Sequence, residues 1–159
     1  MMKKRFLLFV LLSMSLGCAL KHPDSTPVTP YEKVILANAT LAQTNNSIAR
    51  GVIQLQATNP PVLSATTTER ILRIQASIAA DDNKLTLILD QGPTVAKVQA
   101  AQIQSLITAI SQEVDLGIQD GSLGVKNPTS QQTFTTDLGL IKDLSQQIVN
   151  TLKVAGVLQ

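Results

Sequence analysis

The chain has 159 residues, of which 44% are hydrophobic, 15% charged and 3% aromatic, and its formal net charge is +2. Three of the 13 basic side chains lie within the first five residues, so the rest of the chain carries no excess of positive charge. Nucleic-acid binding needs clustered cations and often aromatic platforms for the bases, and this composition excludes it. The length suits one domain with its own hydrophobic core.

The amino-terminal segment has the three-part organisation of a secretory signal. Lys3, Lys4 and Arg5 precede a mostly apolar run over residues 6–16, and Gly17 follows. A helix of that length covers only about half of a ~30 Å hydrocarbon core. A buried amino-terminal helix or a marginal anchor is the alternative, which three consecutive cations disfavour. The pattern therefore predicts a signal peptide at residues 1–17.

The only cysteine, Cys18, comes directly after this segment. Ser15-Leu16-Gly17-Cys18 resembles the lipobox of bacterial lipoproteins, with serine where leucine is commoner. The resemblance implies cleavage before Cys18, a diacylglyceryl thioether on its sulfur and a further acyl chain, such as palmitate, on the new amino group. Two acyl chains already give stable attachment to a membrane. Ala19 in place of an aspartate implies, for a Gram-negative bacterium, an outer-membrane anchor facing the periplasm.

Residues 18–29 are predicted to form a flexible tether. Pro23 and Pro27 are interleaved with aspartate, serine and threonine, a composition typical of extended spacers. At about 3.1 Å per residue, such a tether reaches roughly 35 Å. The only histidine, His22, lies within it. Because nothing there holds an imidazole between a nucleophile and a carboxylate, we interpret His22 as a solvated residue, neither catalytic nor metal-binding.

Residues 30–159 show the apolar periodicity of amphipathic helices. The first helix is predicted over 30–57, with a capping box at Thr29 and Glu32, and Asn59-Pro60-Pro61 ends it. Its apolar residues recur every seventh position, at Val34, Leu41, Ile48 and Leu55.

Three further helices are predicted over 66–90, 94–116 and 128–157. The second starts with a capping box at Thr66 and Glu69, the glycine-containing segment 117–127 is expected to be a loop, and Asn127-Pro128 opens the last helix. Fusion of the middle two helices would give a three-helix alternative, which the strong break at Gly92-Pro93 disfavours. The predicted fold class is all-α, an antiparallel four-helix bundle with up-down-up-down connections.

Asp81-Asp82-Asn83 interrupts the apolar stripe of the second helix, so one of the two carboxylates is expected near the core. Adjacent helical residues diverge by about 100°, which prevents both carboxylates from meeting at one cation. We therefore favour a kink or a local cap with solvated charges over a cation site. Glu113 and Asp115 diverge in the same way, and Glu113 shares a face with Asp120 only if the helix continues past Gly117.

Asn38 and Asn45 fall on the apolar seam of the first helix. A buried polar layer of this kind can fix the register of packed helices at some cost in stability. The alternative is that they line a small polar cavity for a ligand, and the register role is the favoured interpretation.

The sequence offers no residues for catalysis, cofactor binding or metal binding, and its one assigned site is lipid attachment at Cys18. The expected function is that of a lipid-anchored cell-envelope protein with a structural or protein-interaction role, such as an adaptor or assembly factor. Its partner would be another envelope protein or a second copy. The alternative is a carrier of an apolar small molecule or lipid within the bundle, and an enzyme is a third, disfavoured hypothesis.

Overall fold

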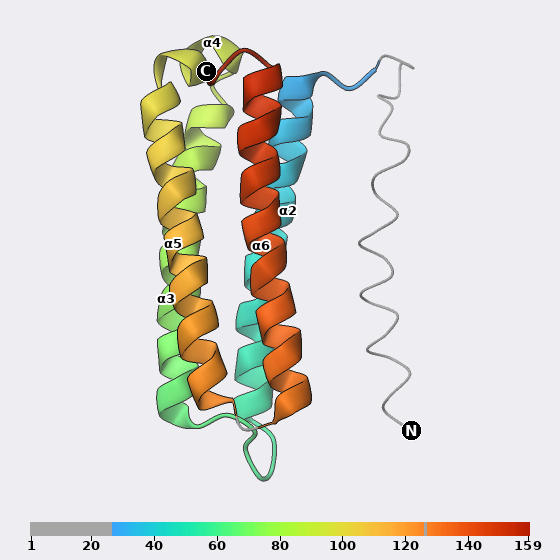
Figure 1. The fold of residues 1–159 in the computed structure, drawn as a ribbon, viewed down its shortest axis with the longest axis vertical. Helices are drawn as coiled ribbons and strands as arrows, with labels where there is room; N and C mark the ends of the chain where they lie inside the picture. Colours follow the sequence, from blue (N-terminus) through green and yellow to red (C-terminus); the bar gives the residue numbers. More distant parts are fainter. Residues whose placement is uncertain (1–26, 126) are drawn as a thin grey trace.

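The computed structural model describes residues 27–125 and 127–159, so the predicted signal peptide, Cys18 and most of the tether lie outside the described residues. The described part is all-α, with five helices packed against each other (Figure 1). The long helices are α2 (Pro30–Gln56), α3 (Ala65–Leu89), α5 (Ala100–Gly124) and α6 (Pro128–Val154), and the short one is α4 (Pro93–Val98). No helix within this described part is long and apolar enough to cross a membrane.

Polar caps fix the first residue of α2 and of α6. In the predicted capping box, the Glu32 backbone N–H donates to Thr29 Oγ1 at 3.2 Å, and the Thr29 N–H donates to Glu32 Oε2 at 2.7 Å. At α6, Asn127 Oδ1 accepts two backbone N–H groups at 3.0 and 3.1 Å. A proline occupies the first turn of both helices, where a backbone N–H is not needed.

The capping box predicted at Thr66 and Glu69 is wrong. The N-cap of α3 is Ser64, whose Oγ accepts the Thr67 backbone N–H at 3.1 Å. Serine is among the best N-cap residues, and it comes two positions earlier in the chain. The helix therefore begins at Ala65, and Thr66 lies within its first turn.

The third predicted helix, over 94–116, is divided in the structure. Gly92 has φ 92° and starts the short α4, and the chain bends again at Gln99 before α5 begins. Ala96 of α4 is fully buried, whereas Val98 is exposed. The bend thus lets α4 cover the core at one end of the molecule instead of extending α5 along its axis (Figure 1).

The loop predicted over 117–127 is wrong for residues 117–124, because α5 continues to Gly124. Gly117 is a contact residue inside this helix. A Cβ atom built on it would lie 3.0 Å from Leu138 Cδ1 of α6 and 3.4 Å from Ile74 Cγ2 of α3. The missing side chain lets three helices approach closely, and it does not end α5.

The core lies between the four long helices. α2 packs against α3 and α6, and α5 packs against the same two helices. Of the heptad positions predicted for α2, Val34, Leu41 and Ile48 are buried and Leu55 is partly buried. The largest fully buried side chains come from all four helices and the α2–α3 connection: Leu41, Leu63, Ile71, Ile78, Leu85, Leu89, Ile103, Ile110, Leu138, Ile141, Ile148 and Leu152.

The start of α2, the last turns of α3 and α6, and α4 lie at the same end of the molecule, here called the α4 end (Figure 1). A hydrogen bond joins two of these elements, because the Tyr31 hydroxyl of α2 donates to the Leu89 carbonyl oxygen of α3 at 2.7 Å. Burial and the nearby Asp90 carboxylate raise the pKa of Tyr31 above its usual value, so the phenol remains a donor.

Candidate functional site

The polar candidates from the sequence fall into two groups. Cys18 and His22 lie outside the described residues, so lipid attachment and the solvated histidine stay predictions. The others lie on α2, α3 and α5, and their contacts show which of them come together.

Asp81, Asp82 and Asn83 lie inside α3, which runs without interruption from Ala65 to Leu89, so the local cap predicted there is wrong. Asp82 is 3% exposed, whereas Asp81 forms an ion pair with Lys84 Nζ at 2.8 Å on the surface. Asn83 is exposed. The two carboxylates therefore diverge as predicted, and the one directed inward is inside the core instead of reaching solvent.

Asp82 lies between two side-chain bridges that join α2 to α3. On one side Asn38 Nδ2 donates to Thr86 Oγ1 at 2.7 Å, and on the other Asn45 Nδ2 donates to the Gln75 carbonyl oxygen at 2.9 Å. Asp82 Oδ1 has no hydrogen-bond partner. Burial penalises the charged carboxylate and raises the pKa of Asp82 to about 6.

Asn38 and Asn45 are both buried, as the heptad pattern predicts, and they bind α3 instead of each other. Together with Gln75, Asp82 and Thr86 they form what we call the polar seam. Several of its atoms lack hydrogen-bond partners: Asn38 Oδ1, Asn45 Oδ1, both Gln75 amide atoms and Asp82 Oδ1. A seam with this many unpaired polar atoms costs stability. Its geometry fits the register role, because each bridge links one position of α2 to one of α3.

Glu113 and Asp115 contact different helices. Glu113 Oε1 accepts the Ser77 hydroxyl of α3 at 3.0 Å, and Asp115 pairs with Lys142 Nζ of α6 at 2.6 Å. The backbone of Asp120 lies in α5, and its side chain is outside the described residues. Over the part of the chain that is described, no group of three or more histidine, cysteine, aspartate or glutamate side chains could hold a metal ion.

A hollow of about 240 Å³ opens beside the polar seam, between α2 and α3. It is lined by Ile35, Asn38, Ala39, Thr86, Leu89 and Asp90. Asn38, Thr86 and Asp90 are the polar residues of this lining, which is otherwise aliphatic. From the sequence, a cavity at Asn38 is only the alternative to the register role, and the other lining residues are not predicted to border one.

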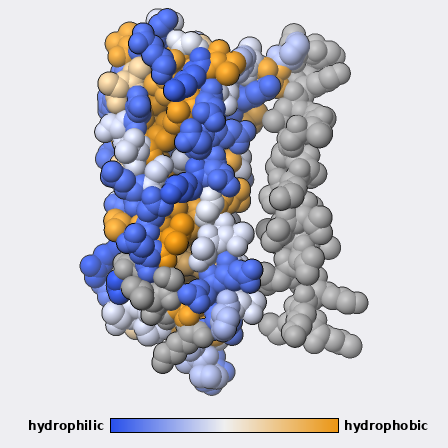
Figure 2. Space-filling view, in the orientation of Figure 1, coloured by the Kyte–Doolittle hydropathy of each residue, from blue (hydrophilic) through white to orange (hydrophobic). Residues whose placement is uncertain are grey.

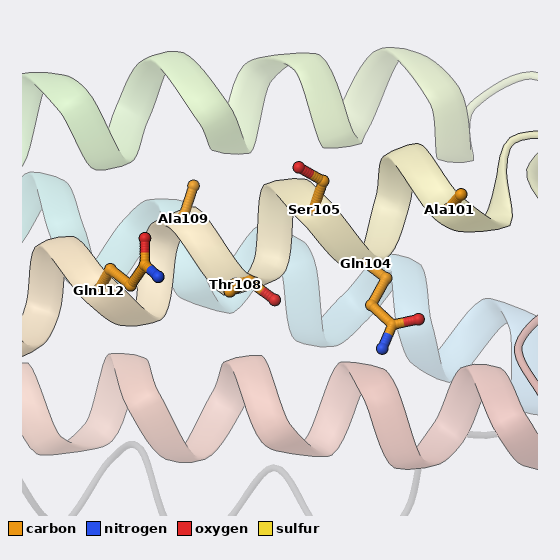
Figure 3. Close-up of a pocket in the computed structure, with 6 residues that line it drawn as sticks. All are labelled: Ala101, Gln104, Ser105, Thr108, Ala109 and Gln112. Atoms are coloured by element: carbon orange, nitrogen blue, oxygen red, sulfur yellow. The ribbon is translucent and has the colours of Figure 1, made fainter.

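The outer face of α5 forms a broad, shallow surface that is open to solvent. Six residues of this one helix form it, and we call them the α5 face: Ala101, Gln104, Ser105, Thr108, Ala109 and Gln112. In Figure 3, Ser105 and Ala109 are directed towards α3, whereas Gln104 is directed towards α6. Helical periodicity does not predict this face, although residues 98–112 contain no charged residue, which is the signal that could have identified it.

The α5 face holds amides, hydroxyls and methyl groups but no side chain that titrates near neutral pH. A hydroxyl without an adjacent base is a weak nucleophile, so this set of groups suits contact with another surface better than chemistry. No family model, no curated protein and no solved structure matches this chain.

Proposed function

We propose that this protein is a lipid-anchored component of the bacterial cell envelope, with a structural or protein-interaction role and no catalysis. The anchor is a set of acyl chains on Cys18, and in a Gram-negative cell the domain faces the periplasm from the outer membrane. What supports the anchor is the order of charges, apolar run, Gly17 and Cys18 at the amino terminus. Two or more acyl chains give attachment that does not depend on a membrane-spanning helix.

The proposal includes an up-down-up-down arrangement of the four long helices. It is supported by the packing of α2 against α3, α3 against α5, α5 against α6 and α6 against α2, which is a closed ring. Short connections between consecutive long helices favour antiparallel neighbours. Such a ring leaves an outward surface on each of the four helices.

The observation that carries the interaction role is the uncharged α5 face. The cores of protein interfaces are depleted in charged residues, because each buried charge must be desolvated. Ala101, Ser105 and Ala109 recur at four-residue spacing, so their small side chains form a shallow row that another helix can approach closely. The glutamine amides beside this row can donate and accept hydrogen bonds, which allows either an envelope protein or a second copy to dock.

The test is site-specific photo-crosslinking in cells that make the lipidated protein. A photoreactive amino acid at Thr108, on the α5 face, is expected to give a discrete adduct with one envelope protein or with a second copy. The matched control is Thr40, an equally exposed threonine on the outer surface of α2. Ser105→Arg, which places a charge in the row, should remove the Thr108 adduct while the helical circular dichroism signal is unchanged. Equal adducts from Thr40 and Thr108 would refute the assignment of the α5 face.

A carrier of an apolar small molecule or lipid is the second candidate function. The hollow beside Asn38 favours it, although about 240 Å³ is below the ~300–1,000 Å³ of typical ligand pockets. A carrier would retain an apolar compound that mass spectrometry detects in an organic extract of the purified protein. Ala39→Trp fills the hollow and should abolish that retention.

A further inference from the structure

The most exposed large hydrophobic side chains of the described residues gather at the α4 end. Val98 is 83% exposed, Val154 is 76% exposed and Leu87 is 67% exposed. Val98 is the last residue of α4, Val154 is the last residue of α6, and Leu87 lies in the final turn of α3. Figure 2 shows apolar surface among hydrophilic residues at this end. Three helices thus place aliphatic groups in solvent at the same end of the molecule.

Lysines accompany these side chains. Lys97 precedes Val98 and Lys153 precedes Val154, both lysines are exposed, and Lys33 lies in the first turns of α2 at the same end. A lysine stem can lie along an apolar layer while its ammonium group stays with water and phosphates. Glu32 and Asp90 are also at this end, so its charge is nearly balanced. Any attraction to a surface there comes mainly from the aliphatic groups.

The chain outside the described residues also meets the molecule at the α4 end. The described residues begin at Pro27, just before α2, and Cys18 lies nine residues earlier in the chain. Nine residues span at most about 30 Å. α2 has 27 residues and is therefore about 40 Å long. An anchor at Cys18 keeps the α4 end within reach of a bilayer, whereas the opposite end comes near one only if the molecule lies on its side.

We infer that the α4 end rests on the surface of the bilayer that holds the anchor, with Val98, Val154 and Leu87 in the interfacial layer and Lys97 and Lys153 at the lipid phosphates. This inference rests on the proposed lipid anchor. A short tether raises the effective concentration of the α4 end at the bilayer to the millimolar range, so a weak contact suffices. The membrane–water interface accommodates aliphatic side chains that insert to a shallow depth and are flanked by lysines. The long helices then point away from the membrane and keep the α5 face open to a partner.

The experiment uses the full lipidated chain in vesicles of phosphatidylethanolamine and phosphatidylglycerol. Val98→Cys and Val154→Cys each introduce a thiol, and Cys18 of the lipidated chain does not compete for a thiol-reactive fluorophore because its sulfur is held in a thioether. The control is Ile53→Cys, which is 52% exposed and lies in the last turn of α2, at the opposite end. Circular dichroism verifies that each variant is helical. The fluorescence emission of the labels at positions 98 and 154 should shift to shorter wavelength. Brominated lipids should quench these two labels several-fold more than the label at position 53.

Flotation of the same vesicles separates this inference from the anchor. If the protein floats with the vesicles but brominated lipids quench none of the three labels, the anchor stands and the contact between the α4 end and the bilayer is refuted. A second control, Leu116→Cys on the side of α5, detects a molecule that lies flat, and strong quenching of that label would also refute the inference. If the protein does not float, the lipid anchor fails and the inference fails with it. Lys97→Glu combined with Lys153→Glu should reduce the quenching at Val98 without changing flotation.

Discussion

Asp82 is an ionisable group inside the hydrophobic core, and its protonation links stability to pH. Its folded-state pKa is about 6, compared with an ordinary value of 3.8, because burial penalises the carboxylate. The folded state therefore binds the proton more tightly than the unfolded chain does. The free energy of unfolding is highest below pH 3.8, the ordinary pKa that the unfolded chain has, and it falls as the pH rises through about 6. At neutral pH the loss reaches about 3 kcal/mol.

Asp82→Asn should remove this pH dependence, because an amide has no charged form. We expect the variant to be more stable than the natural chain at neutral pH, by about 2–3 kcal/mol, and to differ little from it at acidic pH. The measurement is the urea unfolding midpoint of both proteins at pH values below 4 and above 7. Asp137 also has a pKa raised by burial, so the difference between the two proteins, not the natural chain's slope alone, isolates Asp82.

Asp81→Asn is the matched control, since it removes only an exposed ion pair worth at most about 0.5 kcal/mol. If Asp82→Asn destabilises the protein at neutral pH, the carboxylate has a partner that stabilises its charge.

The sequence predicted the polar residues of the core well where helical periodicity sets their position. Asn38 and Asn45 follow from the heptad of α2, and Asp82 follows from the stripe of α3. Periodicity does not predict which atoms find hydrogen-bond partners, because that depends on the side chains of the facing helix. The unpaired atoms of the polar seam and the solvated charge wrongly expected at Asp82 both reflect this limit.

Helix starts were predicted accurately where a proline follows the cap. Thr29 and Asn127 are N-caps as expected, and Gly92-Pro93 separates α3 from the next helix. The errors concern the N-cap of α3, the role of Gly117 and the bend at Gln99. Gly117 was interpreted as a helix terminator, but it permits close contact between α5 and α6, and sequence alone does not reveal which helix faces a glycine.

Gly117→Ala tests this contact between elements. Alanine has a higher helix propensity than glycine, which should stabilise the helix by about 1 kcal/mol. At this position, however, its methyl group would lie 3.0 Å from the buried Leu138 and force repacking that costs about 1–3 kcal/mol. The matched control is Gly139→Ala in α6, where an added Cβ meets no atom within 4 Å. Thermal unfolding should show Gly139→Ala stabilised and Gly117→Ala less stable than that control. Equal stabilisation by both substitutions would mean that Gly117 makes no close contact.

Asn45→Leu tests whether the polar seam sets the register of α2 against α3. Replacing a buried amide that has an unpaired oxygen by a side chain of similar shape should raise stability by about 1–2 kcal/mol. If Asn45 also fixes the register, the variant should show doubled amide resonances for α2 in NMR spectra, from alternative pairings. Asn83→Leu, on the exposed side of α3, should leave a single set. A stable variant with one set of resonances would exclude the register role of Asn45.

At the scale of the whole molecule, hydrophobic patterning was sufficient to predict an all-α protein with a core between long helices. The signal peptide predicted at residues 1–17 lies outside the described residues and stays a prediction. Hydrophobic patterning does not predict the α5 face or the aliphatic groups of the α4 end, because each depends on which side chains remain exposed after packing. These surfaces give the proposed orientation, with one end at the membrane and an uncharged side available to a partner.

The lipid anchor at Cys18 is the claim on which this orientation depends, and mass spectrometry of the amino-terminal peptide from membrane-extracted protein tests it most directly. We predict a chain that begins at Cys18 and carries a diacylglyceryl group on sulfur, with an additional acyl chain on the amino group. A peptide in which Cys18 is unmodified, or in which residues 1–17 are retained, would contradict the account.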